Sequence, residues 1–381
     1  MSHNQILVFM KKGITLVLNI FIWISVSLTS SSITAFAQST TTKGIVYTQA
    51  SDLTICGKLM PTSNPYHRVD TAIFKGFTPS ENTQVRMATG MTIAFKTNSP
   101  LIYLHTDYGQ GSVPISCGYI AVKGYDLYIE KDGTYLYAAS GFPKKLSKAE
   151  EPYKLIGGMD DTYKECLLYL PSFSELHSVK IGISEGSQIE ASENPFRHRV
   201  VVLGSSFTQG AGASRAGMIY TAQLSRNTGI QFLNLGCSGN CKMQPYFADV
   251  LCAVDADAFV FDAFSNPDVK TIEERLFPFI EAIQTAHPGK PLIFLSTLYR
   301  ERRNFDKVTD DRERAKQRKA EQMMAIACKK YKDIYFLKTN ATSKDHNTSV
   351  DGIHPDNHGY ILWVKSIEKP IVKILKKYGI Q

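Results

Sequence analysis

The distribution of hydrophobic and polar residues divides the chain into two regions with different periodicities. From about residue 38 to residue 194, short alternating runs separated by turn residues predict β-strands. Lys131-Asp132-Gly133 predicts a hairpin turn between two of them. Many short strands rich in tyrosine are typical of a β-sandwich. The expected strands are residues 91–96, 101–105, 118–122, 126–129, 134–138, 166–170 and 179–184.

After residue 198 the pattern changes to apolar strands that alternate with helices. Strand starts recur about every 30 residues, which is the spacing that βαβ units require. Such strands predict a parallel sheet covered by helices on both faces. We therefore expect an α/β domain over residues 198–381, preceded by a β-sandwich domain over residues 38–197. The expected strands are residues 200–203, 231–235, 258–261, 292–295 and 334–337, and the expected helices are residues 217–227, 245–253, 269–286, 310–331 and 357 to about 377.

The first 37 residues have the pattern of a secretory signal peptide. Lys11-Lys12 precede an apolar run from Gly13 to about Val26, and Ala35-Phe36-Ala37 matches the small-x-small cleavage pattern. An uncleaved membrane anchor is the alternative, but the run is marginal for crossing about 30 Å of hydrocarbon. We expect cleavage after Ala37 and a periplasmic or secreted protein with no stable membrane association.

Composition and charge exclude several classes of function. The chain has 381 residues, is 43% hydrophobic and carries a net charge of +8, which falls to +6 without the first 37 residues. This mild basicity argues against nucleic-acid binding. Cys237 and Cys241, two of seven cysteines, form a lone C-x3-C with no nearby histidine, so zinc is not expected. The two thiols are either paired or free and buried. No cofactor is predicted.

Polar residues with catalytic potential follow the predicted parallel strands. Ser206, in Gly204-Ser205-Ser206, comes directly after the first strand and is placed as an exposed nucleophile. The alternative is a serine-rich turn that only caps a helix. Gly239 follows the second strand and Asn266 follows the third. A glycine lets backbone N–H groups approach an anion, and an asparagine amide offers an uncharged donor to an oxyanion.

Near the C-terminus, Asp351-Gly352-Ile353-His354 is the only Asp-x-x-His in the chain. This spacing lets a loop carboxylate hold the imidazole in one tautomer, ready to remove a serine proton. His358, one helical turn further on, is the nearest competing base.

Together these motifs resemble the four sequence blocks of the SGNH (GDSL-like) hydrolase superfamily. Gly124-Tyr125-Asp126-Leu127-Tyr128 resembles the Gly-x-Asp-Leu-Tyr signature of a bacterial subgroup with an N-terminal β domain. The resemblance implies a flavodoxin-like parallel sheet preceded by a jelly-roll-like β-sandwich. It also implies that Ser206 is the nucleophile and that His354 is the general base, oriented by Asp351. The implied oxyanion hole consists of the backbone N–H groups of Ser206 and Gly239 and the amide of Asn266.

Three positions depart from the family pattern. Ser205 replaces the usual Asp of the first block, a replacement common in this subgroup. Phe264 stands where the third block often has Gly, which leaves the shape of the acyl pocket open. Cys237 lies beside the implied oxyanion hole, where a buried thiol is the expected role.

The motifs and the signal peptide, together with the family resemblance, imply an exported serine esterase that removes short acyl groups, acetyl above all; that the substrate is a carbohydrate is implied by the resemblance and the expected export. A lipid or lysophospholipid acylhydrolase is the enzymatic alternative, and a catalytically silent glycan-binding protein is the other. Five tyrosines of the first region either stack on sugars or pack in the sandwich: Tyr66, Tyr103, Tyr108, Tyr125 and Tyr128.

The charge-dense run 312–319 is expected to be a solvated helix face, in a helix that starts at Asp310.

Overall fold

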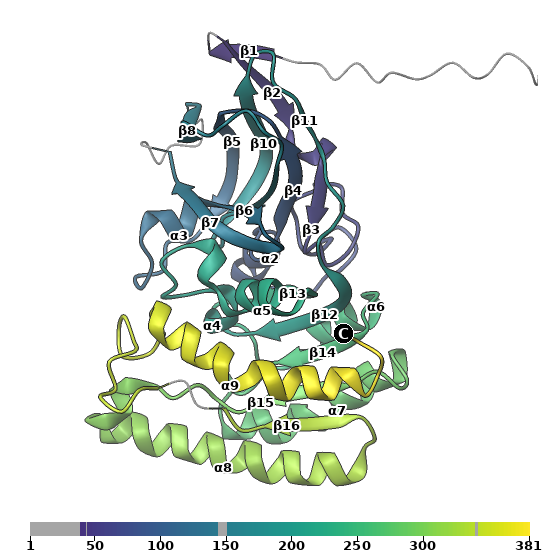
Figure 1. Cartoon of the computed structure of the whole chain (residues 1–381). Coiled ribbons are helices and arrows are strands. Elements are labelled where there is room, and N and C mark those ends of the chain that lie inside the picture. The colour runs from purple at the N-terminus through teal and green to yellow at the C-terminus, as the bar shows by residue number, and fades with distance from the viewer. Residues whose placement is uncertain (1–38, 43, 144–150, 340–341) are drawn as a thin grey trace, which may run out of the picture. The chain divides into compact units, whose positions relative to one another are not determined.

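The first region forms two antiparallel sheets, as the alternating pattern predicts (Figure 1). The computed structural model describes residues 39–42, 44–143, 151–339 and 342–381, and the predicted signal peptide lies outside the described residues. The first sheet has the order β1 (Ser39–Thr42), β2 (Ile45–Gln49), β10 (Ser174–Ser184), β5 (Leu101–Gly111) and β8 (Tyr153–Gly157). The second has the order β11 (Ile189–Ala191), β4 (Thr92–Thr97), β9 (Lys164–Tyr169), β6 (Tyr125–Lys131) and β7 (Thr134–Gly141), and β3 (Thr54–Cys56) pairs with β4.

The two sheets share one buried cluster of side chains. Leu104 and Ile181 come from the first sheet, and Ile93 and Leu127 come from the second. All four are fully buried, because the inward positions of each strand alternate with outward ones. This mutual burial favours a sandwich; the jelly-roll-like form stays a prediction.

One predicted strand of this region is wrong. Residues 118–122 lie mostly in a short helix, α3 (Tyr119–Lys123), between Gly118 and Gly124. A Cβ on Gly124 would lie 2.2 Å from the carbonyl oxygen of Ile120, so only glycine fits where this helix ends. A run of five residues is too short for its periodicity to separate helix from strand. Among the described residues, the other helical segments of the region are η1 (Ala50–Asp52) and α2 (Pro79–Val85).

The second region contains a parallel sheet with the order β13-β12-β14-β15-β16. This is the strand order of flavodoxin-like doubly wound sheets, in which polar loops gather at the carboxyl ends of the strands. The first strand of the region, β12, lies between β13 and β14, so the loop that follows it is flanked by the loops of both neighbours. The strands are β12 (Arg197–Gly204), β13 (Ile230–Gly236), β14 (Ala258–Phe261), β15 (Leu292–Leu295) and β16 (Ile334–Leu337).

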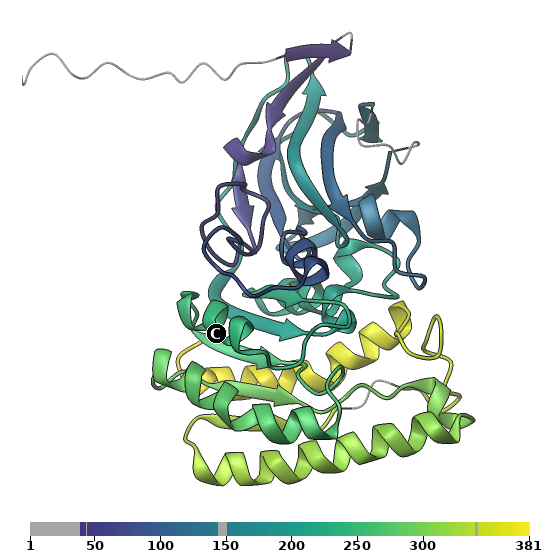
Figure 2. The ribbon, with the colours of Figure 1, turned by 180° about the vertical axis from the view of Figure 1, so that it is seen from behind.

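Helices cover both faces of this sheet (Figures 1 and 2). One face packs on α5 (Tyr220–Thr228) and α9 (Asn357–Lys376), and the other packs on α6 (Pro245–Ala253), α7 (Val269–Ala286) and α8 (Lys307–Lys330). Within the described residues no helix is long and apolar enough to cross a membrane. The remaining helical segments are α4 (Ser206–Gln209), η2 (Ala216–Met218) and η3 (Glu301–Asn304).

The predicted start of α8 at Asp310 is wrong. The helix begins at Lys307, and Asp306 is its N-cap, because its Oδ1 accepts the N–H of Thr309 at 2.9 Å. An N-cap Asp needs only a backbone N–H three residues on, so Asp306 before Thr309 can cap the helix as well as Asp310 before Glu313. The chain uses Asp306, the earlier of the two.

Candidate active site

The side chains of Ser206, His354 and Asp351 form a continuous hydrogen-bonded row. Ser206 Oγ lies 2.9 Å from His354 Nε2. His354 Nδ1 in turn lies 2.8 Å from Asp351 Oδ2. The His354 and Asp351 side chains are 20% and 23% exposed, so the row is accessible from solvent. A row of this kind can pass the serine proton to the imidazole and leave the oxygen nucleophilic.

The loop that carries His354 is fixed by hydrogen bonds to its backbone. Asp351 Oδ1 accepts the N–H groups of Ile353 at 2.9 Å and His354 at 2.7 Å. The hydroxyl of Ser349 donates to the His354 carbonyl at 2.7 Å. Burial disfavours the charged carboxylate, but the hydrogen bonds from His354 and Ile353 outweigh it and hold the pKa of Asp351 below its usual 3.8. Asp351 is therefore ionised at neutral pH and keeps the proton of the imidazole on Nδ1.

The turn before Ser206 is stabilised by a carboxylate from the neighbouring strand. Ser205 is the N-cap of α4, and its Oγ accepts the N–H of Phe207 at 3.2 Å. Asp262, which follows β14, accepts the Ser205 hydroxyl at 2.5 Å and the Ser205 N–H at 3.0 Å. Burial raises the pKa of Asp262, and its several donors oppose that effect. Where the family usually has Asp at position 205, this chain brings the carboxylate of Asp262 to the same turn.

Gly239 and Asn266 lie on the loops that follow β13 and β14, the two neighbours of β12. Asn266 Oδ1 accepts the N–H of Cys241 at 3.2 Å, which joins the two loops and leaves the amide NH2 as a donor. Gly239 has a φ of +74°, a conformation that favours glycine. Within the described residues the N–H groups of Ser206 and Gly239 have no hydrogen-bond partner. Three donors are thus available at the carboxyl ends of three adjacent strands.

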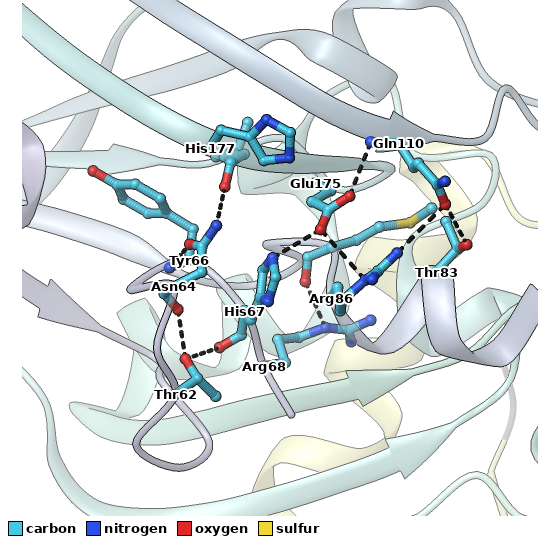
Figure 3. Close-up of polar contacts among 12 residues, drawn as sticks. Thr62, Asn64, Tyr66, His67, Arg68, Thr83, Arg86, Gln110, Glu175 and His177 are labelled. Carbon is cyan, nitrogen blue, oxygen red and sulfur yellow. Dashed lines mark hydrogen bonds and ion pairs between the residues drawn. The ribbon is translucent and has the colours of Figure 1, made fainter. Parts of the chain in front are cut away.

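Arg68, from the first region, holds the strand that leads into the Gly239 loop. Its buried guanidinium donates from Nη1 to the carbonyl oxygens of Asn234 at 3.0 Å and Gly236 at 3.1 Å. Nε donates to the Met87 carbonyl at 2.8 Å, the contact drawn from Arg68 in Figure 3. Burial lowers the pKa of Arg68 to about 10, so the side chain stays charged at neutral pH. One cation from the first region therefore satisfies backbone carbonyls at the end of β13.

Gln84, at the end of α2, binds both residues that flank Gly239. Its Nε2 donates to the Ser238 carbonyl at 3.0 Å, and its Oε1 accepts the side-chain amide of Asn240 at 3.0 Å. From the hydrolase side, Gln209 Oε1 accepts the N–H of Ser238 at 2.8 Å. The Gly239 loop is thus held between an amide from each region.

An ion cluster fixes the segment that carries Arg68 (Figure 3). His67 Nε2 lies 2.8 Å from Glu175 Oε1, and Arg86 Nε lies 3.3 Å from the same oxygen. The Glu175 side chain is only 6% exposed. Burial lowers the pKa of His67, although Glu175 opposes that effect. Because His67 adjoins Arg68 and Arg86 follows α2, this cluster connects both segments that contact the Gly239 loop.

The loop of Asn266 is held by a second ion cluster, which belongs entirely to the α/β region. Arg300 Nη2 and Lys316 Nζ donate to the carbonyl oxygen of Ser265 at 2.8 and 3.0 Å. Glu313 pairs with Arg300 at 3.3 Å and with Lys316 at 3.0 Å. The side chains of Glu313 and Lys316 are 1% and 6% exposed, so the prediction that run 312–319 is a solvated face is wrong at these positions.

The Gly-x-Asp-Leu-Tyr motif forms a contact with the segment that follows α4. Asp126 Oδ2 pairs with Arg215 at 2.8 Å and accepts the N–H of Gly217 at 2.7 Å. The hydroxyl of Tyr128 also accepts a hydrogen bond from Arg215, at 2.8 Å. The Asp126 side chain is 1% exposed, so this ion pair is enclosed between the two regions.

Two other candidates for the site lie away from the row. His358 is exposed on α9, and among the described residues no hydrogen bond or ion pair joins it to Ser206, His354 or Asp351. Phe264 is fully buried in the core, with its ring centroid 6.0 Å from that of Phe294 and 6.2 Å from that of Phe336. Although it lies in the loop after β14, it contributes to the hydrophobic core on one face of the sheet.

The alternatives that the sequence left open are also decided for several residues. All seven cysteines are free, and Cys237 and Cys241 are buried. Burial raises the pKa of Cys237 to about 12, so this thiol is protonated at neutral pH. Of the described residues, no group of histidine, cysteine, aspartate or glutamate side chains could hold a metal ion. Four of the five tyrosines pack in the interior instead of offering a face to sugars: Tyr66, Tyr108, Tyr125 and Tyr128.

Sequence reasoning missed the residues that support the site from a distance. Arg68 and Gln84 lie outside every motif, and no local pattern connects them with residues about 150 positions later. Arg68 lies beside His67 and two residues before Asp70, so the local sequence gave no distinct signal for its role. For Asp262 the signal was stronger, because a carboxylate at the end of an apolar strand in a parallel sheet lies at the reactive edge.

Comparison with known proteins identifies both regions. Residues 197–372 match the GDSL-like Lipase/Acylhydrolase family, and residues 45–189 match the family described as the N-terminus of Esterase_SGNH_hydro-type. A crystal structure from Bacteroides ovatus assigned to the GDSL-like lipases is 38% identical, with a TM-score of 0.84 over 87% of this chain and 98% of that one. No protein of curated function matches.

Two more distant structures share the fold. The salicylyl-acyltransferase SsfX3 of a tetracycline biosynthetic pathway is 18% identical, with a TM-score of 0.60 over 88% of this chain and 96% of that one. A family two carbohydrate esterase from Clostridium thermocellum, solved with cellohexaose, is 12% identical, with a TM-score of 0.55 over 76% of this chain and 93% of that one. With both of its regions matched and a 38% identical relative along nearly its whole length, the chain belongs to the GDSL-like lipase/acylhydrolase family of ester hydrolases, with the GxDLY type of N-terminal region.

Proposed function

We propose that this protein is an exported serine esterase that removes short acyl groups, acetyl above all, from carbohydrate. The observation that carries the proposal is the 2.9 Å contact between Ser206 Oγ and His354 Nε2, with Asp351 on the other imidazole nitrogen. Ester hydrolysis by a serine needs such a base, because the hydroxyl is a weak nucleophile until its proton is removed.

In the first half of the proposed reaction, His354 Nε2 takes the hydroxyl proton while Ser206 Oγ attacks the ester carbonyl carbon. The carbonyl oxygen becomes an oxyanion that accepts hydrogen bonds from the N–H groups of Ser206 and Gly239 and from the Asn266 amide. When the intermediate collapses, the bond to the alcohol oxygen breaks and His354 returns its proton to that oxygen. The acyl group is then esterified to Ser206.

In the second half, a water molecule takes the place of the alcohol. His354 removes one proton from the water as its oxygen attacks the acyl carbon, and the same donors hold the new oxyanion. Collapse breaks the bond to Ser206 Oγ, which recovers its proton from His354. The products are a carboxylic acid and the regenerated enzyme. Asp351 keeps the imidazole oriented and stabilises its charge throughout.

The carbohydrate part of the proposal is supported by the shared fold with carbohydrate esterases and by the predicted export of the chain. A silent glycan-binding protein is disfavoured, because the whole Ser206 row is present with hydrogen-bonding geometry. Export is tested by N-terminal sequencing of the protein from the periplasm or medium of its host. A chain that begins at Gln38 supports it, and one that retains residues 1–37 contradicts it.

The chemistry is tested with Ser206→Ala and phenyl acetate. We expect kcat to fall at least about 10⁴-fold, since the nucleophile is lost. Ser187→Ala, in the turn after β10, is the matched control and should keep full activity. An active-site phosphonate should label the native protein and the control, but not Ser206→Ala. Unchanged hydrolysis by Ser206→Ala would refute the proposed nucleophile.

A further inference from the structure

A hollow of about 480 Å³ opens beside Asn266, the residue proposed to donate its amide to the oxyanion. Its walls come from the start of α7, the segment after β15 and the first half of α8. The segment after β15 also reaches the His354 loop, because the N–H of Arg302 donates to the Gly352 carbonyl at 2.8 Å. The hollow therefore shares Asn266 with the proposed oxyanion hole, and the segment after β15 connects its wall to the loop of His354.

The charged lining of this hollow is predominantly cationic. Four cations line it, and the only acidic groups among the lining residues are Asp268 and Glu313. Asp268 is committed to the N-terminus of α7, where its Oδ1 accepts the N–H of Thr271 at 2.8 Å. The lining thus carries two more positive charges than negative ones. The four cations are Lys270, Arg300, Arg312 and Lys316.

Three of these cations share a single carboxylate. Arg300, Lys316 and Arg312 lie 3.3, 3.0 and 3.5 Å from Glu313. Because Glu313 is buried, an acidic side chain that approaches from solvent cannot add a second negative charge beside it. Burial lowers the pKa of Lys316, and repulsion from Arg300 lowers it further. An anion in the hollow would relieve this excess of positive charge.

Support of the Asn266 loop does not need all of these cations. Arg300 and Lys316 already bind the Ser265 carbonyl and neutralise Glu313 between them. The Arg312 side chain is 59% exposed, and its one ion pair with the described residues is the 3.5 Å contact with Glu313. Its guanidinium therefore remains accessible to a ligand in the hollow, and a planar guanidinium is well suited to a carboxylate or a sulfate.

We infer that this hollow binds an anionic group of the substrate, so that the enzyme acts on acyl esters of acidic saccharides. The group is an oxyanion such as a sugar carboxylate or a sulfate ester. The exposed Arg312 and Lys270 bind it, and the half-buried Arg300 and the buried Lys316 add positive potential. The inference rests on the proposed esterase function and names its substrate class.

The experiment compares acetyl esters that differ only in charge. Acetylated methyl glucoside is neutral, acetylated methyl glucuronide carries a carboxylate, and a sulfated acetylated methyl glucoside carries a sulfate. For the native enzyme we expect kcat/KM to be at least about tenfold higher for one or both anionic esters. Raising NaCl from about 20 mM to about 500 mM should remove most of that preference, because salt screens exposed charges.

Arg312→Gln isolates the hollow from the catalytic row. We expect about a fivefold loss of kcat/KM for the preferred anionic ester and less than about a twofold change for the neutral one, since exposed charge pairs have modest energies. Arg318→Gln, exposed on the same helix but outside the lining of the hollow, makes the same change in net charge. It should leave all three esters unaffected.

The outcomes separate this inference from the esterase proposal. If phenyl acetate is cleaved but the neutral sugar ester is preferred, or Arg312→Gln affects all esters equally, the inference is overturned and the esterase stands. If no ester is cleaved, calorimetric titration of the native protein with methyl glucuronide and with a sulfated methyl glucoside decides. Binding that Arg312→Gln weakens supports the anion site without the esterase, and absence of binding overturns both.

Discussion

The two loops proposed to form the oxyanion hole are supported by different chemistry. The Gly239 loop is held by amides, Gln84 from one region and Gln209 from the other, and the strand leading into it is held by Arg68. The Asn266 loop is held from within its own region by Arg300 and Lys316, which both donate to the Ser265 carbonyl and both pair with Glu313. One loop thus depends on packing between regions, and the other depends on charge balance inside a helix-covered sheet.

This difference determines how strongly each loop responds to the loss of a supporting side chain. Neutral hydrogen bonds contribute about 1 kcal/mol each, so losing one of several is tolerable. Removing one member of a buried ion cluster leaves the others unpaired in a poorly solvated place, which costs much more. We therefore expect the Asn266 loop to be more sensitive to substitution than the Gly239 loop.

The largest expected effect comes from Glu313→Gln. It leaves the Arg300 and Lys316 charges, both largely buried, without their shared carboxylate. We expect the free energy of unfolding to fall by about 3–5 kcal/mol in urea titrations. Glu321→Gln, further along α8 and more exposed, should cost less than about 0.5 kcal/mol. An unchanged urea midpoint for Glu313→Gln would show that the cluster does not support this loop.

Asn266→Ala removes one proposed donor while the loop itself stays in place. We expect kcat to fall about 10²–10³-fold with little change in KM, because the amide is needed mainly when negative charge develops on the substrate oxygen. Steady-state kinetics with phenyl acetate and a parallel melting curve measure both quantities. A rise in KM with unchanged kcat would instead assign Asn266 to ground-state binding.

Gln84→Ala should have the smallest effect of the three. It removes the bonds to Ser238 and Asn240 but leaves the loop attached through Gln209. We expect kcat to fall about three- to tenfold, with KM nearly constant, since one support of a donor is loosened and substrate contacts are kept. Thr83→Ala is the control, because Thr83 adjoins Gln84 on α2 and is half-buried, and its hydroxyl bonds to Gln110 and not to the Gly239 loop. A loss as large as that of Asn266→Ala would contradict the contrast drawn between the loops.

Much of the fold follows from sequence patterns that are strong over long segments. The strands over 258–261, 292–295 and 334–337 and the helices over 245–253 and 269–286 coincide with the observed elements. Their apolar strands and helical periodicity agree with burial in a two-faced parallel sheet. The error at residues 118–122 arose where the segment is short and glycines at both ends decide the conformation.

The Ser206 row could be predicted because its members lie at the ends of recognisable elements and within motifs. The structure joins Ser206, His354 and Asp351 by hydrogen bonds, as the Asp-x-x-His spacing suggested. The supports of the loops could not be predicted in the same way. Arg68 acts on carbonyls about 165 positions away in sequence, and Glu313 was assigned to solvent because its neighbours are charged. Local charge density does not reveal which member of a run turns inward.

The placement of Arg68 also limits how such a chain can change over evolutionary time. Its guanidinium donates to the carbonyls of Asn234 and Gly236, so an α/β region joined to an unrelated N-terminal region would lose these donors at the end of β13. A gene fusion that replaced only the N-terminal region would be selected against unless the new region placed an arginine where Arg68 lies. We therefore expect the N-terminal β region and the α/β region to evolve as a pair.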